Sequence, residues 1–169
     1  QEAPTSKSVR FKWREHVTKT VSENGEALEK FCNALKDGNS EVVEQSLNNY
    51  LKRTISIRDP LVKKQMKENF YHGILLGILG FQQNWSVSSN KESGDGYSDI
   101  LIETEDQETG IIIEIKYAET GNLEAVSEEA LKQIEDRRYE EQLLEEGVEH
   151  ILKYGIAFYK KKCKVMAVK

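Results

Sequence analysis

The first half of the chain spaces its apolar residues three and four positions apart, which is the period of an amphipathic helix. One apolar face runs from position 25 to 36, and a second runs from position 40 to about 51. The polar sequence Asp37-Gly38-Asn39-Ser40 lies between them, where it ends the first helix and caps the second. The pattern therefore predicts a helical hairpin within residues 23–54.

A third helix is predicted to begin at Asp59-Pro60, because an Asp side chain accepts hydrogen bonds at a helix N-cap and Pro already has a helical φ. This helix should continue to about Phe81. Its second half is apolar on nearly every side, as expected of a helix buried against a sheet. The apolar residues concerned are Ile74, Leu75, Leu76, Ile78 and Leu79.

After Gln83 the apolar period changes to two, which is typical of strands. Strands are predicted at residues 85–89, 97–103, 111–117, 154–159 and 163–168. Residues 124–146 have a helical composition, in one long piece or two shorter ones, and Gly147 ends it. A lysine-rich turn joins the last two strands.

This order of elements predicts an α/β (α+β) fold, in which helices flank a mixed central sheet. Residues 55–169 should form that core, after the helical hairpin. Residues 1–22 are polar and basic and are expected to form a flexible arm or linker. The length of 169 residues, with 38% hydrophobic and 31% charged residues, fits one compact soluble domain.

The sequence does not lead us to expect a membrane-spanning, secreted, zinc-binding or disulfide-linked protein. The longest apolar stretch, residues 73–81, is too short to span a bilayer, and no secretory leader is visible. Cys32 and Cys163 are far apart and lack partners at metal-ligand spacing, so neither a zinc site nor a disulfide framework is indicated. We therefore expect a cytoplasmic protein with no membrane contact.

The net charge of −5 is unevenly distributed along the chain. Residues 153–169 hold six lysines and no acid, and residues 52–67 hold six basic residues against the single acid Asp59. Eleven carboxylates lie within residues 119–149. The segregation favours one basic face suited to nucleic acid, although charge runs of this kind also occur on ordinary solvated surfaces.

The strand at 111–117 carries charged residues at positions where burying a charge costs free energy. A run that is apolar on both faces belongs at the centre of a sheet, yet Glu114 and Lys116 interrupt it. Because they are two residues apart, both side chains point to the same face.

The acidic turn at 104–110 suggests how this strand pairs with the one before it. An antiparallel register centred on the turn sets Asp99 directly opposite Glu114, with Cβ atoms about 5 Å apart. Two carboxylates so close repel each other unless a divalent cation lies between them. The carbonyl of Ile115 would face the same region. Periodicity alone thus suggests a metal site.

Lys116 would stand beside such a metal, where an amine can hold or help deprotonate the attacking water. The competing interpretation is a surface salt bridge between Glu114 and Lys116, since a Glu-x-Lys triplet often occurs by chance. Spacing by itself leaves both interpretations open.

The motifs together resemble those of the PD-(D/E)XK nuclease superfamily. The resemblance rests on Gly96-Tyr97-Ser98-Asp99, on Glu114-Ile115-Lys116 in the next strand, and on Gln133 with Tyr139 in the following helix. A closer likeness is to the branch found at the C-terminus of bacterial AAA-ATPase-like proteins, through Glu68-Asn69-Phe70-Tyr71-His72, Ser89-Asn90-Lys91-Glu92-Ser93-Gly94 and Ala130-Leu131-Lys132-Gln133-Ile134. The resemblance covers about residues 55–168 and implies a restriction-endonuclease-like αβββαβ core.

Carried over position by position, the resemblance implies metal binding by Asp99 and Glu114 and a water-orienting role for Lys116. Glu68 matches a position on the long helix that often supplies another acidic ligand. His72 lies one helical turn further on the same face, and it is equally well explained as a polar residue packed under the sheet.

Four further residues are implied less directly. Gln133 matches a glutamine thought to orient groups near the metal or the scissile phosphate, and Arg137, one turn further, could contact phosphate. Tyr97 stands where the closer branch usually has a basic residue. Tyr139 is further from Gln133 than in exonuclease relatives. Ser98 replaces the proline of the motif name, which the superfamily tolerates.

The sequence therefore predicts a Mg²⁺- or Mn²⁺-dependent nuclease that hydrolyses phosphodiester bonds, in DNA more than in RNA. One alternative is a non-catalytic nuclease-fold module attached to an ATPase-like domain on the same chain. Another is an ordinary α/β interaction domain whose motif matches are accidental.

Overall fold

The structure is a computed structural model that describes residues 25–54, 64–91, 97–136 and 139–169. The predicted arm at 1–22 and the helix start at Asp59-Pro60 lie outside the described residues. The elements follow the chain in this order: α2 (Gly25–Asp37), α3 (Ser40–Thr54), α4 (Lys64–Leu79), β1 (Ser86–Lys91), β2 (Tyr97–Glu103), β3 (Thr109–Tyr117), α5 (Leu123–Asp136), α6 (Tyr139–Glu145), β4 (His150–Tyr159) and β5 (Lys162–Val168).

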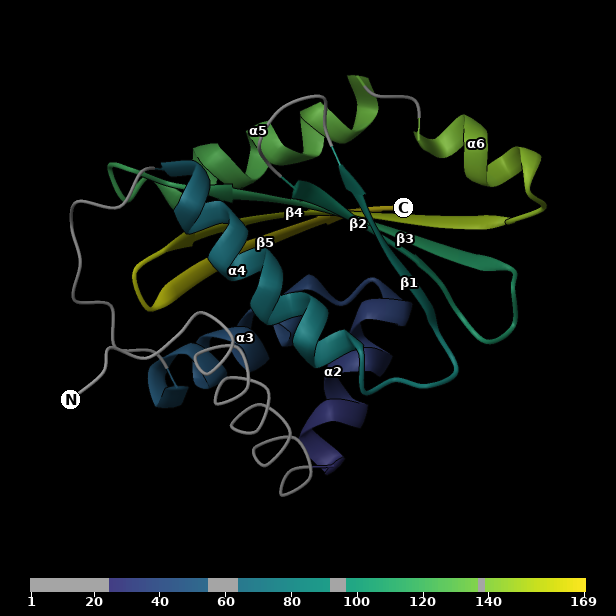
Figure 1. Cartoon of the computed structure of the whole chain (residues 1–169), viewed down its shortest axis with the longest axis horizontal. Coiled ribbons are helices and arrows are strands. Elements are labelled where there is room, and N and C mark those ends of the chain that lie inside the picture. Colours follow the sequence, from purple (N-terminus) through teal and green to yellow (C-terminus); the bar gives the residue numbers. More distant parts are fainter. Residues whose placement is uncertain (1–24, 55–63, 92–96, 137–138) are drawn as a thin grey trace, which may run out of the picture.

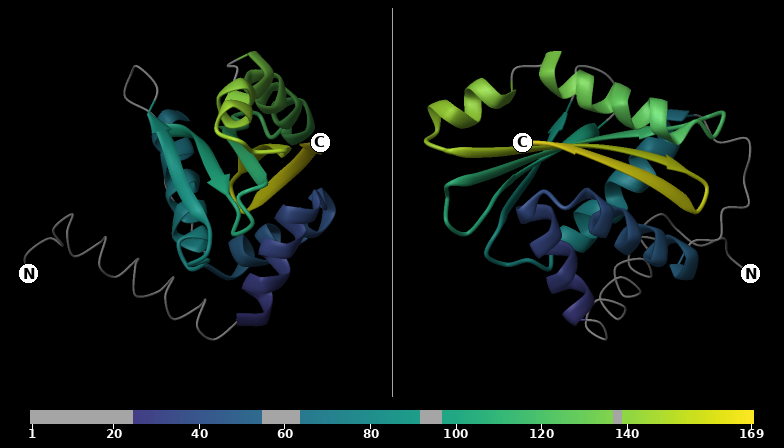
Figure 2. Two further views of the ribbon diagram at one scale, coloured as in Figure 1. Left: turned by 90° about the vertical axis from the view of Figure 1, so that its right-hand side faces the viewer. Right: turned by 180° about the vertical axis from the view of Figure 1, so that it is seen from behind.

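The described strands form one five-stranded sheet in the order β1-β2-β3-β4-β5. All neighbouring pairs are antiparallel except β3 and β4, which are parallel and joined by a crossover through α5 and α6. Helices α2, α3 and α4 lie on one side of the sheet, and α5 and α6 lie on the other (Figures 1 and 2). The predicted α/β (α+β) class, with a mixed sheet between helices, is confirmed.

Two hydrophobic clusters pack the faces of the sheet. The larger one joins buried residues of α2, α3 and α4 to one face of β2, β3, β4 and β5. The smaller one joins Ile112 of β3 to Ile134, Leu143 and Val148, which lie on or next to α5 and α6. β3 is the middle strand, and the side chains of Ile111, Ile112 and Ile113 are fully buried, as expected of a strand that is apolar on both faces.

The α2–α3 hairpin packs directly against the sheet. The hydroxyl of Tyr154 in β4 donates to the carbonyl of Leu35 in α2 at 2.6 Å. Two side chains of α3 bond the outer edge of β5: Asn48 accepts from the amide of Cys163 at 2.8 Å, and Glu44 accepts from the amide of Val165 at 2.9 Å. The division of the chain into a hairpin at 23–54 and a core at 55–169 stays a prediction, but the two segments share one hydrophobic cluster.

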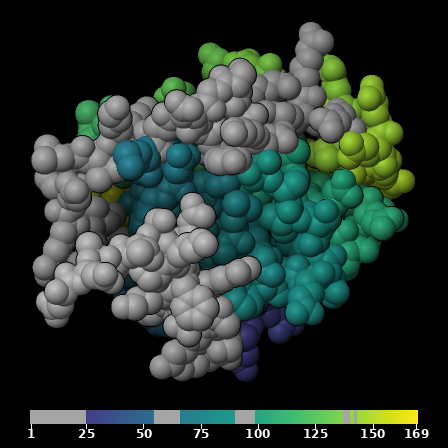
Figure 3. Space-filling model, in the orientation of Figure 1, coloured from purple at the N-terminus to yellow at the C-terminus, as the bar shows by residue number. Residues whose placement is uncertain are grey.

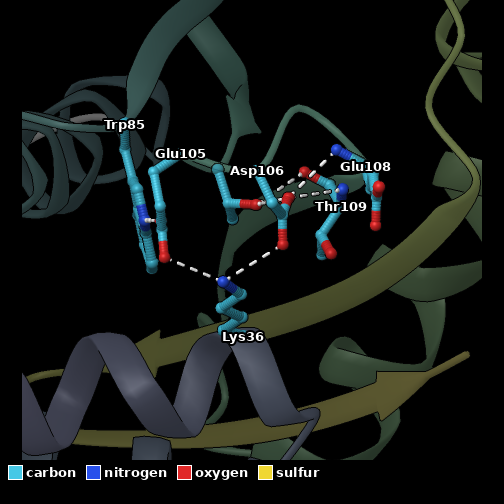
Figure 4. Close-up of polar contacts among 7 residues, drawn as sticks. Lys36, Trp85, Glu105, Asp106, Glu108 and Thr109 are labelled. Atoms are coloured by element: carbon cyan, nitrogen blue, oxygen red, sulfur yellow. Dashed lines mark hydrogen bonds and ion pairs between the residues drawn. The ribbon is translucent and has the colours of Figure 1, made fainter.

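A polar cluster ties α2 to the turn between β2 and β3 (Figure 4). The ammonium of Lys36 lies 2.8 Å from the Glu105 carboxylate and 3.2 Å from that of Asp106. The indole N–H of Trp85 donates to Glu105 at 2.6 Å. Asp106 in turn accepts from the amides of Glu108 and Thr109, so that it caps the turn from within.

On the face seen in Figure 3, the surface of α4 adjoins that of the β1–β2 hairpin. The chain tightens after Leu79, because the amides of Phe81 and Gln82 donate to carbonyls three residues back, those of Ile78 and Leu79. The helix therefore ends two residues before the predicted Phe81.

None of the helices in the described residues is both long and apolar enough to cross a membrane.

Other elements also differ in length from the prediction. β4 begins at His150, four residues before the predicted start, because it pairs with Thr109 of β3 and its amide donates to the carbonyl of Glu108. α3 continues to Thr54, whose hydroxyl donates to the carbonyl of Tyr50. The helical segment 124–146 is present as the two pieces α5 and α6, which is one of the two forms predicted for it.

Candidate active site

Asp99 and Glu114 are directly opposed across the antiparallel pair formed by β2 and β3. This is the register predicted from the centre of the turn at 104–110, and it is confirmed. Opposed residues share one face, with Cβ atoms about 5 Å apart. Both side chains are almost fully buried, at 0% and 1% relative exposure.

The face that carries these acids is the one covered by α5. Ile100 of β2 and Ile113 of β3 belong to the cluster that packs against α2, α3 and α4. Because side chains alternate along a strand, Asp99 and Glu114 point to the opposite face. On that face Leu101 and Ile112 pack against residues of α5 and α6.

Lys116 continues the same face, two residues beyond Glu114. Its side chain is 17% exposed, and its ammonium lies 4.0 Å from the carboxylate of Glu129 on α5. The Glu129 side chain is mostly exposed, so this ion pair is a weak one. The amine of Lys116 thus lies at the border between the buried acids and solvent.

Helix α5 approaches the sheet closely beside Glu114. Gly155 of β4 is paired with Glu114 in the parallel register. A Cβ atom at Gly155 would lie 2.3 Å from the carbonyl oxygen of Ser127 and 2.9 Å from the Leu131 amide, both on α5. Only a residue without a side chain fits there, so Gly155 sets how close α5 comes to the acids.

Two predicted site residues of α4 contact the backbone of the same two strands. Glu68 accepts a hydrogen bond from the amide of Tyr117 at 3.1 Å. His72 is buried and donates a hydrogen bond to the backbone of Asp99. Burial lowers the pKa of His72, and this hydrogen bond opposes part of that shift.

For the other predicted site residues the structure gives a position in the fold but less detail about the side chain. Gln133 is half-buried on α5, one turn beyond Glu129. The side chain of Ile115 packs in the large cluster, so only its backbone carbonyl could serve the site. Tyr97 begins β2 and Tyr139 begins α6, but their side chains, and Arg137 as a whole, lie outside the described residues.

The donor set on this face is two carboxylates from neighbouring strands, which are oxygen ligands of the kind that Mg²⁺ and Mn²⁺ accept. Within the described ranges, no group of three or more His, Cys, Asp or Glu residues is arranged to hold a metal. Mg²⁺ is commonly held by one or two carboxylates together with water and substrate phosphates, so a pair of acids fits such an ion.

Sequence reasoning missed three residues that shape the site. Gly155 and Ser127 set the approach of α5, and Glu129 contacts Lys116. A glycine inside a strand pattern often marks a close backbone approach, and this signal was available at Gly155. Glu129 is one of many acids in its segment, and nothing in the sequence distinguishes it.

A family model of the PD-(D/E)XK nuclease superfamily matches residues 66–168, which is more than half of the chain. The match runs from α4 to the last strand and includes the αβββαβ core. The comparison with curated proteins finds no significant match, and the comparison with solved structures finds none either.

Proposed function

Because the chain belongs to the PD-(D/E)XK nuclease superfamily, we propose that it is a metal-dependent nuclease whose active site is centred on Asp99, Glu114 and Lys116. The superfamily suggests phosphodiester hydrolysis in a nucleic acid, and its nucleases generally use divalent metals. The observation that carries the proposal is the cross-strand pairing of Asp99 with Glu114, with Lys116 on the same face. We expect DNA rather than RNA as the substrate.

The carboxylates of Asp99 and Glu114 would hold the metal, with the carbonyl of Ile115 as a further oxygen donor. Glu68 of α4 would be a further acidic ligand only if its side chain moved, because it now bonds the amide of Tyr117 and forms no three-residue metal-binding group with Asp99 and Glu114 within the described residues. A bound Mg²⁺ or Mn²⁺ would supply neutralisation of charge on the phosphate and a lowered pKa for the attacking water.

Lys116 would orient the attacking water and neutralise charge on the phosphate. Its partly buried position supports this role, because electrostatic interactions are stronger where water is excluded. The mostly exposed Glu129 restrains the amine only weakly, so Lys116 can turn towards a bound substrate. Gln133 on the same helix would orient groups near the scissile phosphate.

The remaining candidates have supporting roles in this proposal. His72 would fix the backbone of Asp99, and thereby the direction of its carboxylate, through the hydrogen bond from α4. Arg137, Tyr97 and Tyr139 would contact the substrate. An ATPase-like domain on the same chain would be the partner that the closer family branch suggests.

A second candidate function is a non-catalytic nuclease-fold module that binds nucleic acid or regulates an ATPase-like domain. One observation favours it: Asp99 and Glu114 are nearly inaccessible, so a phosphodiester can reach them only if neighbouring groups move. The presence of the two acids and the lysine on one face favours the catalytic function.

Incubation of the full chain with plasmid, single-stranded DNA and RNA, in Mg²⁺ or Mn²⁺, tests the proposal. Asp99→Asn, Glu114→Gln and Lys116→Met should each lower cutting by about 100-fold or more, since each removes charge at the reacting phosphate. Glu103→Gln is the matched control, because it removes an acid from the same face of β2 without touching the pair. Cutting by none of the proteins, with nucleic-acid binding retained, would establish the module instead.

A further inference from the structure

The turn between β4 and β5 carries three consecutive lysines at the tip of a tight hairpin. Tyr159 pairs with Lys162, so Lys160 and Lys161 form the connection. All three lysines are exposed. Within the described part of the chain, no acidic side chain forms an ion pair with any of them. We call Lys160, Lys161 and Lys162 the lysine turn.

The backbone of the lysine turn is one that lysine disfavours. Lys160 has a φ of 53°, in the left-handed region that Gly and Asn adopt most easily. A cation is thus present where backbone preference alone would select a different residue. An outlier of this kind is a reason to look for a function in the side chain.

A stack of rings holds the lysine turn in place. The hydroxyl of Tyr71 on α4 donates to the carbonyl of Lys160 at 2.5 Å. The Tyr71 ring stacks on Phe158 of β4 with centroids 4.4 Å apart, and on Tyr117 of β3 with centroids 6.0 Å apart. A ligand at the turn would therefore meet a backbone that is already ordered.

The lysine turn is close to the candidate active site. Lys116 pairs with Ala157 in the parallel register, and Lys160 follows three residues later, which is about 10 Å along the strand. The Lys160 ammonium lies 5.1 Å from the centre of the Tyr159 ring, which packs against Tyr117, the last residue of β3. The turn projects at the end of the sheet where β3 also ends (Figure 2, right).

Two further lysines extend the positive charge around this end of the sheet. The ammonium of Lys67 on α4 lies 4.7 Å from the centre of the Tyr117 ring. Glu44 and Asn48 of α3 bond Val165 and Cys163 in turn, so the helix runs towards the lysine turn, and the exposed Lys52 follows one helical turn after Asn48. The basic residues thus come from α3, α4 and the β4–β5 hairpin.

We propose that the lysine turn binds the phosphate backbone of the nucleic-acid strand that enters the active site. The separation of about 10 Å from Lys116 corresponds to about three nucleotides at a rise of about 3.4 Å per nucleotide. Phosphate contacts of this kind position a strand without reading its sequence. The inference rests on the proposed function for the identity of the polymer, but it concerns binding and not hydrolysis.

The test is binding of fluorescently labelled single-stranded and duplex DNA by the full chain, followed by anisotropy in EDTA from about 50 mM to about 200 mM salt. The triple variant Lys160→Asn, Lys161→Gln, Lys162→Gln should bind at least about tenfold more weakly. The slope of log affinity against log salt concentration should fall by about 2 to 3, because up to three phosphate contacts are lost. The single change Lys160→Asn should weaken binding while leaving the melting temperature unchanged or raised.

The control triple variant Lys30→Gln, Lys132→Gln, Lys169→Gln removes the same charge from exposed positions elsewhere. An equal loss in both triple variants would mean that only net charge matters and would overturn the proposal, as would an unmodified chain that binds neither DNA. Preferential loss of binding to anionic lipid vesicles, with DNA binding kept, would overturn it in favour of a membrane. If DNA binding depends on the turn while no protein cuts DNA or RNA, the hydrolase proposal fails and the binding surface stands.

Discussion

Glu114 and Gly155 are direct neighbours in the parallel pair of β3 and β4, and α5 lies against Gly155 on the face that carries the acid. The position of α5 over the candidate site therefore depends on Gly155 having no side chain. Any atom added at Gly155 must displace α5, and α5 carries Gln133 and Glu129.

Gly155→Ala should destabilise the protein and reduce its activity together. The added Cβ would lie 2.3 Å from the Ser127 carbonyl, which is backbone and cannot turn aside. Overpacking of this kind costs about 1–3 kcal/mol in the free energy of unfolding. Urea unfolding and cleavage rates measure the two effects.

Gly73→Ala is the matched control for that change. Gly73 is exposed on α4, and a Cβ there meets no atom within 4 Å. Alanine should raise the free energy of unfolding by up to about 1 kcal/mol, because it has the higher helix propensity. Similar destabilisation by both substitutions would contradict the close-approach account.

Glu68→Gln separates the two roles available to Glu68. Glutamine keeps an oxygen that can accept from the Tyr117 amide, so stability should change little, whereas the loss of charge should lower metal-dependent activity about 10-fold or more. Melting curves and cleavage at several Mg²⁺ concentrations provide the readouts. Full activity in this variant would leave Glu68 with a positioning role only.

His72 should make stability depend on pH near neutrality. Burial lowers its pKa from the usual 6.5, so the unfolded chain takes up a proton first as the solution is acidified. This contribution to stability is fully present above about pH 6.5 and is lost as pH falls through the folded pKa. Urea midpoints at about pH 8 and about pH 5 should differ less in His72→Gln than in the unmodified protein, and equal differences would refute the assignment.

Asp106 should make stability depend on pH in a more acidic range than His72 does. The hydroxyl of Thr104, followed by the amide of Glu108, lowers the pKa of its carboxyl below the usual 3.8. A depressed carboxyl pKa stabilises the fold above the unfolded value, and the effect is lost as pH falls further. Asp106→Asn should therefore be less stable than the unmodified chain near pH 5, and the gap should narrow below about pH 3. A gap that stays constant would be the contrary result.

Asn48→Ala should destabilise the edge of the sheet. It removes the acceptor for the Cys163 amide and the donor to the Cys163 carbonyl, which costs about 1–3 kcal/mol where water cannot replace them. Asn49→Ala, at the exposed neighbouring position, is the control and should change the free energy of unfolding by less than about 0.5 kcal/mol. Equal effects would show that α3 does not hold the β5 edge through Asn48.

Much of the core could be predicted because its signals are local. The register of Asp99 with Glu114 follows from the centre of one short turn, and the central position of β3 follows from its continuous apolar run. The two-residue period of side chains then fixed which residues share a face with Lys116.

The features that could not be predicted depend on contacts between distant segments. The early start of β4 at His150 depends on pairing with Thr109 of β3, and no local pattern marks it. The bonds from Glu44 and Asn48 to β5 join residues more than a hundred positions apart. Polar side chains on a helix usually face water, so their role at a strand edge has no signature in the sequence.

Because a long crossover joins β3 to β4, two parts of the candidate site should form at different rates during folding. Asp99 and Glu114 are 15 residues apart in one hairpin, whereas Glu114 and Gly155 are 41 residues apart. Hairpins close in about 1–10 μs, and pairings across long loops wait for a larger loss of chain entropy. We expect the acids to become neighbours early in folding, and the arrival of β4 with α5 to decide when they are shielded from water.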